Sequence, residues 1–340
     1  RLWDEFRLTT SFEPFLPSFD YPNAPAALDS MTDNAVWWLE QTGIDGFRQD
    51  AVKHIPNGFW RTLTRKIKRE IAVPQQRRIY QIGETFGGYD LVSSYVNNGQ
   101  LDAQFNFNLY DVAKYVFLAP DASFATLDAE LQRTFAVYGS NHLMGNVMDS
   151  HDKVRYMAFA DGDISLDGGE AIEAGWHNPP EVDDPASYKK LQIYLLYLMA
   201  TPGLPTLYYG DEIGMTGAAD PDNRRMMRFG ADLSMLEREN LTQVRQIVGL
   251  RKRFPALRTG DFQTLLADES CWLFLRSEMK ERLLVAINKS TSERAVTVEL
   301  PAFYQSTKAT HAVSGHVLPV SDHTLTIDIP ALGWEVFRLQ

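Results

Sequence analysis

The sequence predicts an α/β fold in which a partial (β/α)8 TIM barrel is followed by a C-terminal antiparallel β-sandwich. Short apolar segments alternate with helical patterns, which indicates parallel βα units. Each of these segments ends in polar residues, and a TIM barrel builds its active site at these strand ends. After Pro255 a two-residue alternation replaces the helical spacing, which is typical of antiparallel strands. An open doubly wound sheet is the alternative, but no glycine-rich phosphate loop follows any of the strands.

The elements of the barrel portion can be placed in chain order. Prolines between aromatic residues predict an irregular segment over residues 1–27. A helix is expected from residue 29 to 42, where Gly43 stops it, and a second from 57 to 71, capped by Asn57. Further helices are expected at 188–200 and 241–253. The five expected strands are 44–50, 78–84, 101–107, 145–152 and 204–212.

The last part of the chain reads as a small all-β domain with one face of each strand in water. Its length suits a sandwich of five to seven strands. The domain organisation expected is an irregular segment at 1–27, a barrel portion at 28–257 and a sandwich at 258–340. The strands predicted for the sandwich are 271–276, 283–288, 295–300, 325–329 and 334–339.

Composition excludes several classes of protein. The net charge is −11, and no basic face is present that could serve as a nucleic-acid footprint. The single cysteine, Cys271, excludes an internal disulfide and a cysteine-based zinc site. The longest strongly apolar run, residues 193–200, is too short to span a bilayer. Compartment and oligomeric state stay open.

The strand count raises a difficulty. A parallel barrel of this class has eight strands, and only five are predicted here. An open barrel would expose backbone donors and apolar side chains at both edges. Either some strands escape the pattern or the remaining strands precede Arg1, and we prefer the second interpretation.

Three carboxylates stand at the ends of predicted strands: Asp50, Glu84 and Asp152. Neighbouring strands lie ~4.8 Å apart, so carboxylates at adjacent strand ends can reach across one shared mouth. Two carboxyl groups about 5–5.5 Å apart are what a retaining glycosidase needs. Asp50 and Glu84 follow consecutive strands and are therefore the natural pair.

Arg48 separates the roles of the two carboxylates. It lies two residues before Asp50 and so shares its strand face, where it would hold Asp50 ionised as a nucleophile must be. Glu84 has no such partner in sequence, which suits a general acid. Standing alone, Arg48 and Asp50 would more often form a structural ion pair. The ordered combination with Glu84 and Asp152 favours the catalytic interpretation.

These segments resemble the α-amylase family of glycoside hydrolases, and the resemblance covers essentially the whole chain. GFRQDAVKH (46–54) resembles the family's nucleophile motif, GETF (83–86) its acid/base motif and VMDSHD (147–152) the motif of its third carboxylate. LPSFDY (16–21) is similar to the end of inserted domain B. TPGLPTLYYGDEIGM (201–215) resembles the eighth strand, and DPDNRRMMRF (220–229) the loop after it.

The resemblance implies a role for each matched residue. Asp50 would be the nucleophile, Glu84 the general acid/base, and Asp152 the group that binds sugar hydroxyls and stabilises the transition state. The substrate-binding residues implied are Arg48, which orients Asp50; His151 in the cleavage subsite; Lys53, His54 and Phe86 on the leaving-group side; and Asp220 and Arg224 at the next glucose on the non-reducing side. The alternatives are a solvated loop for Lys53 and His54, and a surface ion pair for Asp220 and Arg224.

The chain departs from the family pattern in two places. The family's Asp…Asn-His motif at the third strand has no counterpart, so strands four to eight are the ones expected here. Asp20 also stands where relatives often have Asn. No cofactor is implied. A structural calcium is one option that the resemblance leaves open, with the backbone carbonyl near His54 as a candidate ligand.

The implied function is hydrolysis of α-1,4 and also α-1,6 glucosidic bonds in starch-type glucans, maltooligosaccharides or cyclodextrins. The motifs after residue 201 resemble the neopullulanase and cyclomaltodextrinase branch of the family more than they resemble secreted endo-amylases. One alternative is a transglycosylase with the same carboxylates. A second is a non-catalytic relative that binds glucan or a protein partner, which the presence of all three carboxylates disfavours.

Overall fold

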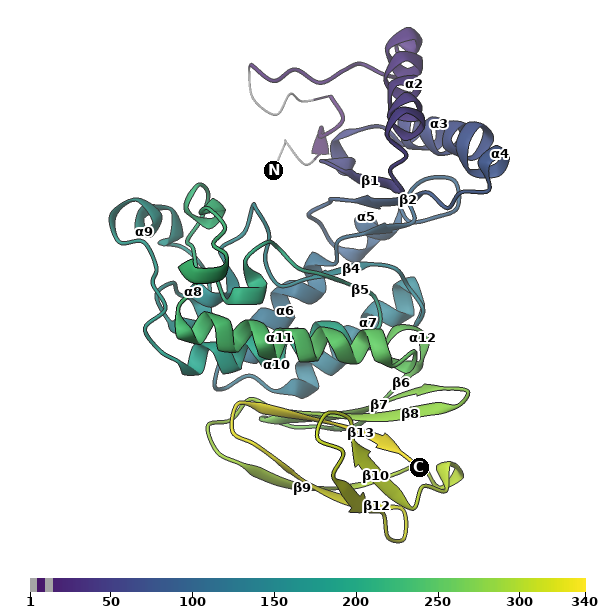
Figure 1. Cartoon of the computed structure of the whole chain (residues 1–340). Helices are drawn as coiled ribbons and strands as arrows, with labels where there is room; N and C mark the ends of the chain where they lie inside the picture. The colour runs from purple at the N-terminus through teal and green to yellow at the C-terminus, as the bar shows by residue number, and fades with distance from the viewer. Residues whose placement is uncertain (1–4, 10–14) are drawn as a thin grey trace. The chain divides into compact units, whose positions relative to one another are not determined.

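The structure is a computed structural model that describes residues 5–9 and 15–340. The chain forms two compact units, whose helices and strands are labelled in Figure 1. The expected irregular segment at 1–27 falls partly outside the described residues, and its end is helical, because α2 begins at Pro25, where a proline suits the first turn of a helix. The first unit contains Arg1–Asn108 and Leu143–Gly145, and the second contains Leu109–His142 and Asn146–Gln340.

The first unit consists mainly of strand–helix repeats. Two elements, α6 (Phe107–Leu118) and β4 (Gly145–Val147), have residues in both units. The other elements of the first unit are α2 (Pro25–Thr42), β1 (Gly46–Gln49), η1 (Val52–His54), α3 (Asn57–Ile67), the π-helical turn η2 (Lys68–Ala72), α4 (Val73–Gln75), β2 (Tyr80–Gly83), α5 (Tyr89–Ser93) and β3 (Ala103–Gln104).

The second unit holds the remaining helices and all the strands of the C-terminal sheets. Its helices are α7 (Phe124–Tyr138), α8 (Tyr156–Asp161), α9 (Ala171–His177), α10 (Ala186–Ala200), α11 (Met235–Arg253) and α12 (Ala256–Thr259), with short turns η3 (Asp211–Ile213), η4 (Asp222–Arg224), η5 (Gly230–Asp232) and η6 (Ala302–Tyr304). Its strands are β5 (Leu204–Thr206), β6 (Asp261–Ala267), β7 (Cys271–Glu278), β8 (Glu281–Asn288), β9 (Arg294–Glu299), β10 (Lys308–His311), β11 (Val317–Pro319), β12 (Thr324–Ile329) and β13 (Gly333–Leu339).

The five strands expected in the barrel portion are present as β1 to β5, each shorter than its predicted range. In the first unit β1, β2 and β3 pair in parallel in that order, as predicted. A parallel bridge also joins Phe105 to Gly145 at the start of β4, and in the second unit β4 pairs with β5. Gly46 opens β1 where a side chain would meet the carbonyl oxygen of Tyr80 at 1.7 Å, so only glycine fits there.

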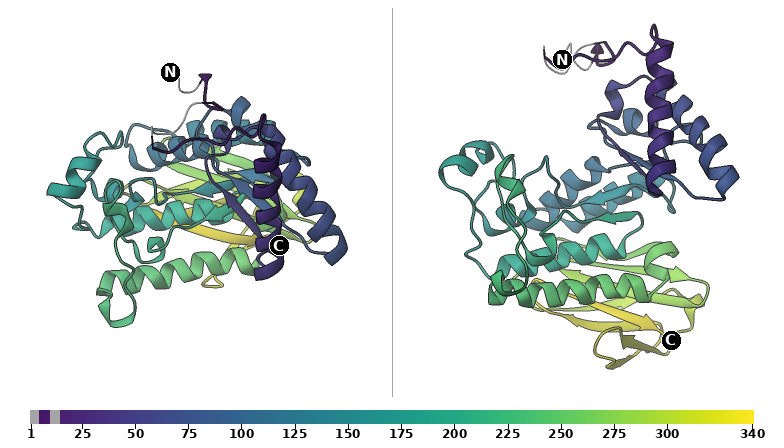
Figure 2. Two further views of the ribbon diagram at one scale, coloured as in Figure 1. Left: turned by 90° about the horizontal axis from the view of Figure 1, so that it is seen from above. Right: turned by 45° about the horizontal axis from the view of Figure 1, so that its top comes forward.

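Helix α10 is the centre of the second unit. It is buried on nearly every face, because it packs against α8, α11 and the C-terminal sheet (Figures 1 and 2). Burial of each large apolar side chain in such a core contributes about 1.5–3 kcal/mol. At its C-terminal end the carbonyl of Ala200 accepts a hydrogen bond from the fully buried Arg276 of β7, which also donates to Leu257 at 3.1 Å and Gly260 at 2.8 Å. The guanidinium thus satisfies carbonyls at the ends of two helices.

The C-terminal strands form two antiparallel sheets, as predicted. One has the order β11-β10-β13-β8-β7-β6 and the other pairs β12 with β9. The prediction that each strand has one wet face is right for β9 and β12 but wrong for β7 and β8. Trp272 and Phe274 of β7 pack into the core that contains α10, whereas Leu273 and Leu275 pack toward β9 and β12. The central strands therefore lie between a helical layer and a second sheet.

The N-terminal caps of α11 and α3 differ from prediction for identifiable reasons. Helix α11 begins six residues earlier than expected because Ser234 and Glu237 form a capping box, with N···O distances of 3.2 and 2.7 Å. The prediction that Asn57 caps α3 is wrong, because Pro56 occupies the cap position and Asn57 is already helical. None of the helices in the described part of the chain combines the length and apolar character needed to cross a membrane.

Candidate active site

Asp50 and Glu84 are the first residues after two neighbouring parallel strands, at matching positions of the strand register. The last register pair of β1 and β2 is Gln49 with Gly83, so each carboxylate residue comes directly after it. Backbone hydrogen bonds continue the pairing past the strand ends. Glu84 N–H donates to the Gln49 carbonyl at 2.8 Å, and Val52 N–H donates to the Glu84 carbonyl at 3.0 Å. The expectation that this pair follows consecutive, adjacent strands is confirmed.

A tight turn after Asp50 joins it to the Glu84 carboxylate. Ala51 adopts a left-handed backbone conformation with φ of 47°, and its N–H donates to Oε2 of Glu84 at 3.1 Å. A hydrogen bond from a backbone N–H to a carboxylate is charge-assisted and directional. The turn therefore holds the Glu84 side chain beside the peptide that follows Asp50.

The two carboxylates have different surroundings. Arg48 forms an ion pair with Oδ1 of Asp50, as their shared strand face predicts, and the Asp50 side chain is 75% exposed. Glu84 is only 9% exposed. One carboxylate thus lies in solvent beside a guanidinium, and the other is buried against the backbone. Environments this different can assign two carboxylates to two chemical roles.

The other candidate residues of the first unit lie close to this pair in the chain. Lys53 donates from Nζ to the carbonyl of Phe86 at 3.0 Å, which ties the segment after β1 to the segment after β2. The Phe86 ring is 37% exposed and stacks on Phe107 with ring centroids 4.1 Å apart. His54 is buried, and its Nδ1 lies 3.2 Å from the carbonyl oxygen of Arg7.

In the second unit Arg224 joins the remaining candidates. Its Nη2 lies 3.2 Å from Oδ1 of Asp152 and 2.9 Å from Oδ2 of Asp220. Its Nε donates to the backbone carbonyl of His151 at 3.0 Å, and His151 Nε2 lies 3.0 Å from Oδ2 of Asp152. These four side chains are each roughly half exposed. The structure brings them together as one cluster, which we call the Asp152 cluster.

Asn223 supports the Asp152 cluster and was not predicted from the sequence. It is fully buried, and its Nδ2 donates to the carbonyls of His151 at 2.8 Å and Lys153 at 2.9 Å. It thereby fixes the backbone on both sides of Asp152. An asparagine in a polar loop gives no sequence signal of burial, so the pattern could not single it out.

Beneath these loops lies a buried group of charges, Asp149, Arg155 and Asp211, each no more than 3% exposed. Arg155 Nη1 lies 3.5 Å from Oδ1 of Asp211, and its Nε donates to the carbonyl of Asn223 at 2.9 Å. Asp149 accepts a hydrogen bond from the N–H of Tyr156 at 2.9 Å. The Arg155 guanidinium thus interacts electrostatically with both carboxyls. Its hydrogen bond to Asn223 also fixes the segment that precedes Arg224.

Burial raises the pKa of Asp211 well above its usual value, and Asp149 raises it further while Arg155 opposes the shift. Burial also raises the pKa of Asp149. The folded protein therefore keeps a proton that the unfolded chain releases above about pH 4. The resulting stabilisation is complete below that pH and is lost as pH rises through the folded-state pKa.

We therefore expect Asp211→Asn to flatten the fall of stability with pH, because the amide is neutral and can still accept from Tyr208 N–H. The measurement is the melting temperature between about pH 5 and about pH 9, beside the exposed control Asp328→Asn on β12. The wild type should lose stability relative to Asp211→Asn toward alkaline pH. Parallel curves for both proteins would show that no proton is held at this pair.

The strand–helix repeats make this an α/β protein. Its acidic site lies at the ends of adjacent parallel strands, where Asp50 and Glu84 follow β1 and β2. Residues 3–261 match the model of the alpha amylase catalytic domain, and the chain belongs to the alpha-amylase family. The sequence-based recognition of the family is thereby confirmed. Within residues 5–9 and 15–340, no group of three or more His, Cys, Asp or Glu side chains could hold a metal ion.

Named relatives fit this membership. The chain is 26% identical over 336 residues to a cyclomaltodextrinase of Geobacillus thermopakistaniensis, covering 98% of this chain and 51% of the relative. It is 28% identical over 292 residues to neopullulanase 2 of Thermoactinomyces vulgaris, covering 85% and 44%. The chain thus spans about half the length of these relatives. A crystal structure of the alpha-amylase of Geobacillus thermoleovorans with acarbose matches with a TM-score of 0.80 at 27% identity, covering 98% of this chain and 68% of that one.

Proposed function

We propose that the protein is a retaining glycoside hydrolase that cleaves α-1,4, and also α-1,6, glucosidic bonds in starch-type glucans, maltooligosaccharides and cyclodextrins. One observation carries the proposal: Asp50 and Glu84 follow adjacent parallel strands at the same level, joined through Ala51, in a chain of the alpha-amylase family. The relatives named cyclomaltodextrinase and neopullulanase support the choice of substrates.

In the first half-reaction Asp50 is proposed as the nucleophile. Its carboxylate attacks the anomeric carbon as the bond to the leaving glycosidic oxygen breaks, and Glu84 transfers its proton to that oxygen. The product is a covalent glycosyl ester on Asp50 and a released glucan with a new free end. The Arg48 ion pair supports this role because it holds the Asp50 carboxylate in place at the end of β1.

In the second half-reaction Glu84 is proposed as the base. It takes a proton from a water molecule that attacks the anomeric carbon, which breaks the ester bond to Asp50. Two inversions restore the original α configuration. This chemistry requires no cofactor, and a structural calcium near the His54 carbonyl stays a separate prediction from the family resemblance.

The remaining candidates are proposed as sugar-binding groups. Asp152 would bind hydroxyls of the reacting sugar and stabilise its oxocarbenium-like transition state, with His151 bonding to the same sugar. Asp220 and Arg224 would bind the next glucose on the non-reducing side. The ion pairs of the Asp152 cluster support this assignment, because they fix these side chains relative to one another. Lys53, His54 and Phe86 would contact the leaving-group side.

The stereochemistry of the product tests the proposal. Full-length protein is mixed with maltoheptaose, β-cyclodextrin or pullulan, and the first reducing ends released are followed by proton NMR. We expect α anomers first, followed by slow mutarotation. Initial β anomers would contradict the retaining mechanism, and no cleavage of any substrate would favour a binding protein. Early products longer than maltoheptaose would identify a transglycosylase, in which a sugar hydroxyl replaces the attacking water.

A further inference from the structure

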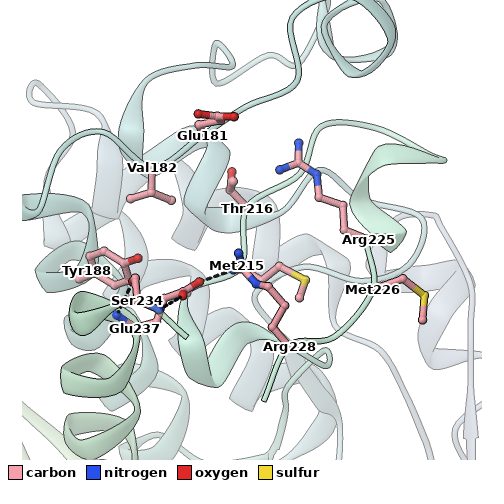
Figure 3. Close-up of a pocket in the computed structure, with 11 residues that line it drawn as sticks. Glu181, Val182, Tyr188, Met215, Thr216, Arg225, Met226, Arg228, Ser234 and Glu237 are labelled. Carbon is pink, nitrogen blue, oxygen red and sulfur yellow. Dashed lines mark hydrogen bonds and ion pairs between the residues drawn. The ribbon is translucent and has the colours of Figure 1, made fainter. Parts of the chain in front are cut away.

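The second unit contains a pocket that the proposed catalytic residues do not line. Its volume is about 460 Å³, within the usual range for small-molecule sites. It is formed by the second half of the DPDNRRMMRF motif, the segment Gly214–Thr216 and the start of α11 (Figure 3). Asp152, Asp220 and Arg224 are not among its lining residues. The proposed reaction therefore gives this part of the motif no role.

Both arginines that line the pocket are paired with carboxylates. Arg225 donates to both carboxylate oxygens of Asp222, at 2.8 and 2.7 Å, and to the carbonyl of Pro180 at 2.9 Å. Arg228 forms an ion pair with Glu237. Glu181 adds a negative charge at the rim. An anion would therefore meet no uncompensated positive charge, and the lining favours a neutral ligand.

The hydroxyl of Thr216 in the wall lacks a hydrogen-bond partner among the residues that the structure describes. Thr216 is only 8% exposed. Figure 3 shows it in the pocket wall among Glu181, Arg225 and Met215. A buried hydroxyl without a partner costs about 1–3 kcal/mol, so such groups call for an explanation. A ligand hydroxyl in the pocket would supply the missing hydrogen bond.

Apolar side chains form another part of the wall. Met215, Met226 and Val182 line the pocket, and the phenol of Tyr188 lies beside the start of α11. Met226 is 87% exposed although it is a large apolar side chain. A thioether chain adapts readily to the shape of a ligand. The pocket therefore suits a neutral molecule that has hydroxyl groups on its edge and an apolar face.

We propose that this pocket is a second saccharide-binding site that takes one or two neutral hexopyranose units. A pyranose ring carries hydroxyls around its edge and C–H groups on its faces, which matches Thr216 and Glu181 on one side and the methionines on the other. That the sugar is an α-glucan rests on the proposed function. A saccharide bound in this pocket would stabilise the loop that contains both Arg225 and its neighbour Arg224.

The test is a titration of full-length protein with maltose, observed through the ¹³C-labelled methyl groups of its methionines. Met215 and Met226 report on the pocket, each assigned by its Leu variant, and Met279 at the β7–β8 turn serves as the internal reference. We expect both pocket signals to shift with one common dissociation constant while Met279 stays fixed. Because the shifts report binding and not turnover, a failed catalytic assignment does not change the readout. The titration is repeated in an Asp50→Asn background to slow any hydrolysis of maltose.

A matched pair of variants separates binding from structure. Thr216→Val removes the hydroxyl at nearly constant volume and should weaken maltose binding about three- to tenfold. Because that hydroxyl has no hydrogen-bond partner in the part of the chain that the structure describes, the melting temperature should stay the same or rise. Thr326→Val on β12, an exposed threonine in the same unit whose hydroxyl bonds to that of Thr297, should leave maltose affinity unchanged.

Three results would overturn the proposal. The first is the absence of maltose-dependent shifts at Met215 and Met226 up to the solubility limit. The second is unchanged maltose affinity in Thr216→Val with a lowered melting temperature, which would assign the hydroxyl a purely structural role. The third is saturation of the same signals by inorganic phosphate but not by maltose, which would make the pocket an anion site.

Discussion

Asp50→Asn is expected to lower kcat for maltoheptaose hydrolysis by roughly 10⁴- to 10⁶-fold, the range typical for removal of a covalent nucleophile. The amide is isosteric with the carboxylate but carries no charge and cannot form the glycosyl ester. It can still accept a hydrogen bond from Arg48, which keeps the local structure. The melting temperature should therefore change little, and the loss should fall on kcat.

The matched control is Asp45→Asn, an exposed carboxylate in the same unit just before β1. It should keep wild-type kcat. A fluorinated substrate that reacts quickly in the first step and slowly in the second should leave a sugar on the Asp50 peptide, visible by mass spectrometry. Normal turnover by Asp50→Asn, or a sugar attached to another residue, would remove Asp50 from the mechanism.

The candidate pair was predictable because the information is local. Ile44 and Phe47 mark the apolar start of the predicted strand, and Arg48 and Asp50 come at its end. The same pattern recurs at β2 and Glu84. Strand periodicity placed Arg48 and Asp50 on one face, and the observed ion pair agrees. The capping box of α11 was equally local, and the S-x-x-E pattern at Ser234 was present in the sequence.

Other features depend on packing that no local pattern encodes. Asp149, Arg155 and Asp211 look like surface residues in sequence, yet all three are buried because separate loops close over them. Strand β6 escaped prediction because a bulge between Thr264 and Leu266 interrupts its two-residue alternation. The two-sided burial of β7 depends on α10 covering one face of the sheet, which only the tertiary structure shows.

Glu84→Gln is expected to lower kcat for maltoheptaose by about 10²- to 10⁴-fold, the usual contribution of general acid–base catalysis. The amide oxygen can still accept the hydrogen bond from Ala51 N–H, so the turn after Asp50 should be retained. The side chain can no longer donate a proton to the leaving oxygen or accept one from water. Both half-reactions should therefore slow.

The choice of substrate separates these two functions of Glu84. With α-maltosyl fluoride the leaving group departs as fluoride and needs no proton, so the first step should be far less affected than with maltoheptaose. The glycosyl ester on Asp50 should then accumulate, because the second step still lacks its base. Azide attacks without losing a proton, so it should restore turnover of the fluoride and yield α-maltosyl azide with retained configuration. The control is Glu40→Gln, at an exposed position on α2. Equal losses with both substrates and no azide product would show that Glu84 does not transfer the proton, and the acid/base role would then belong to another residue.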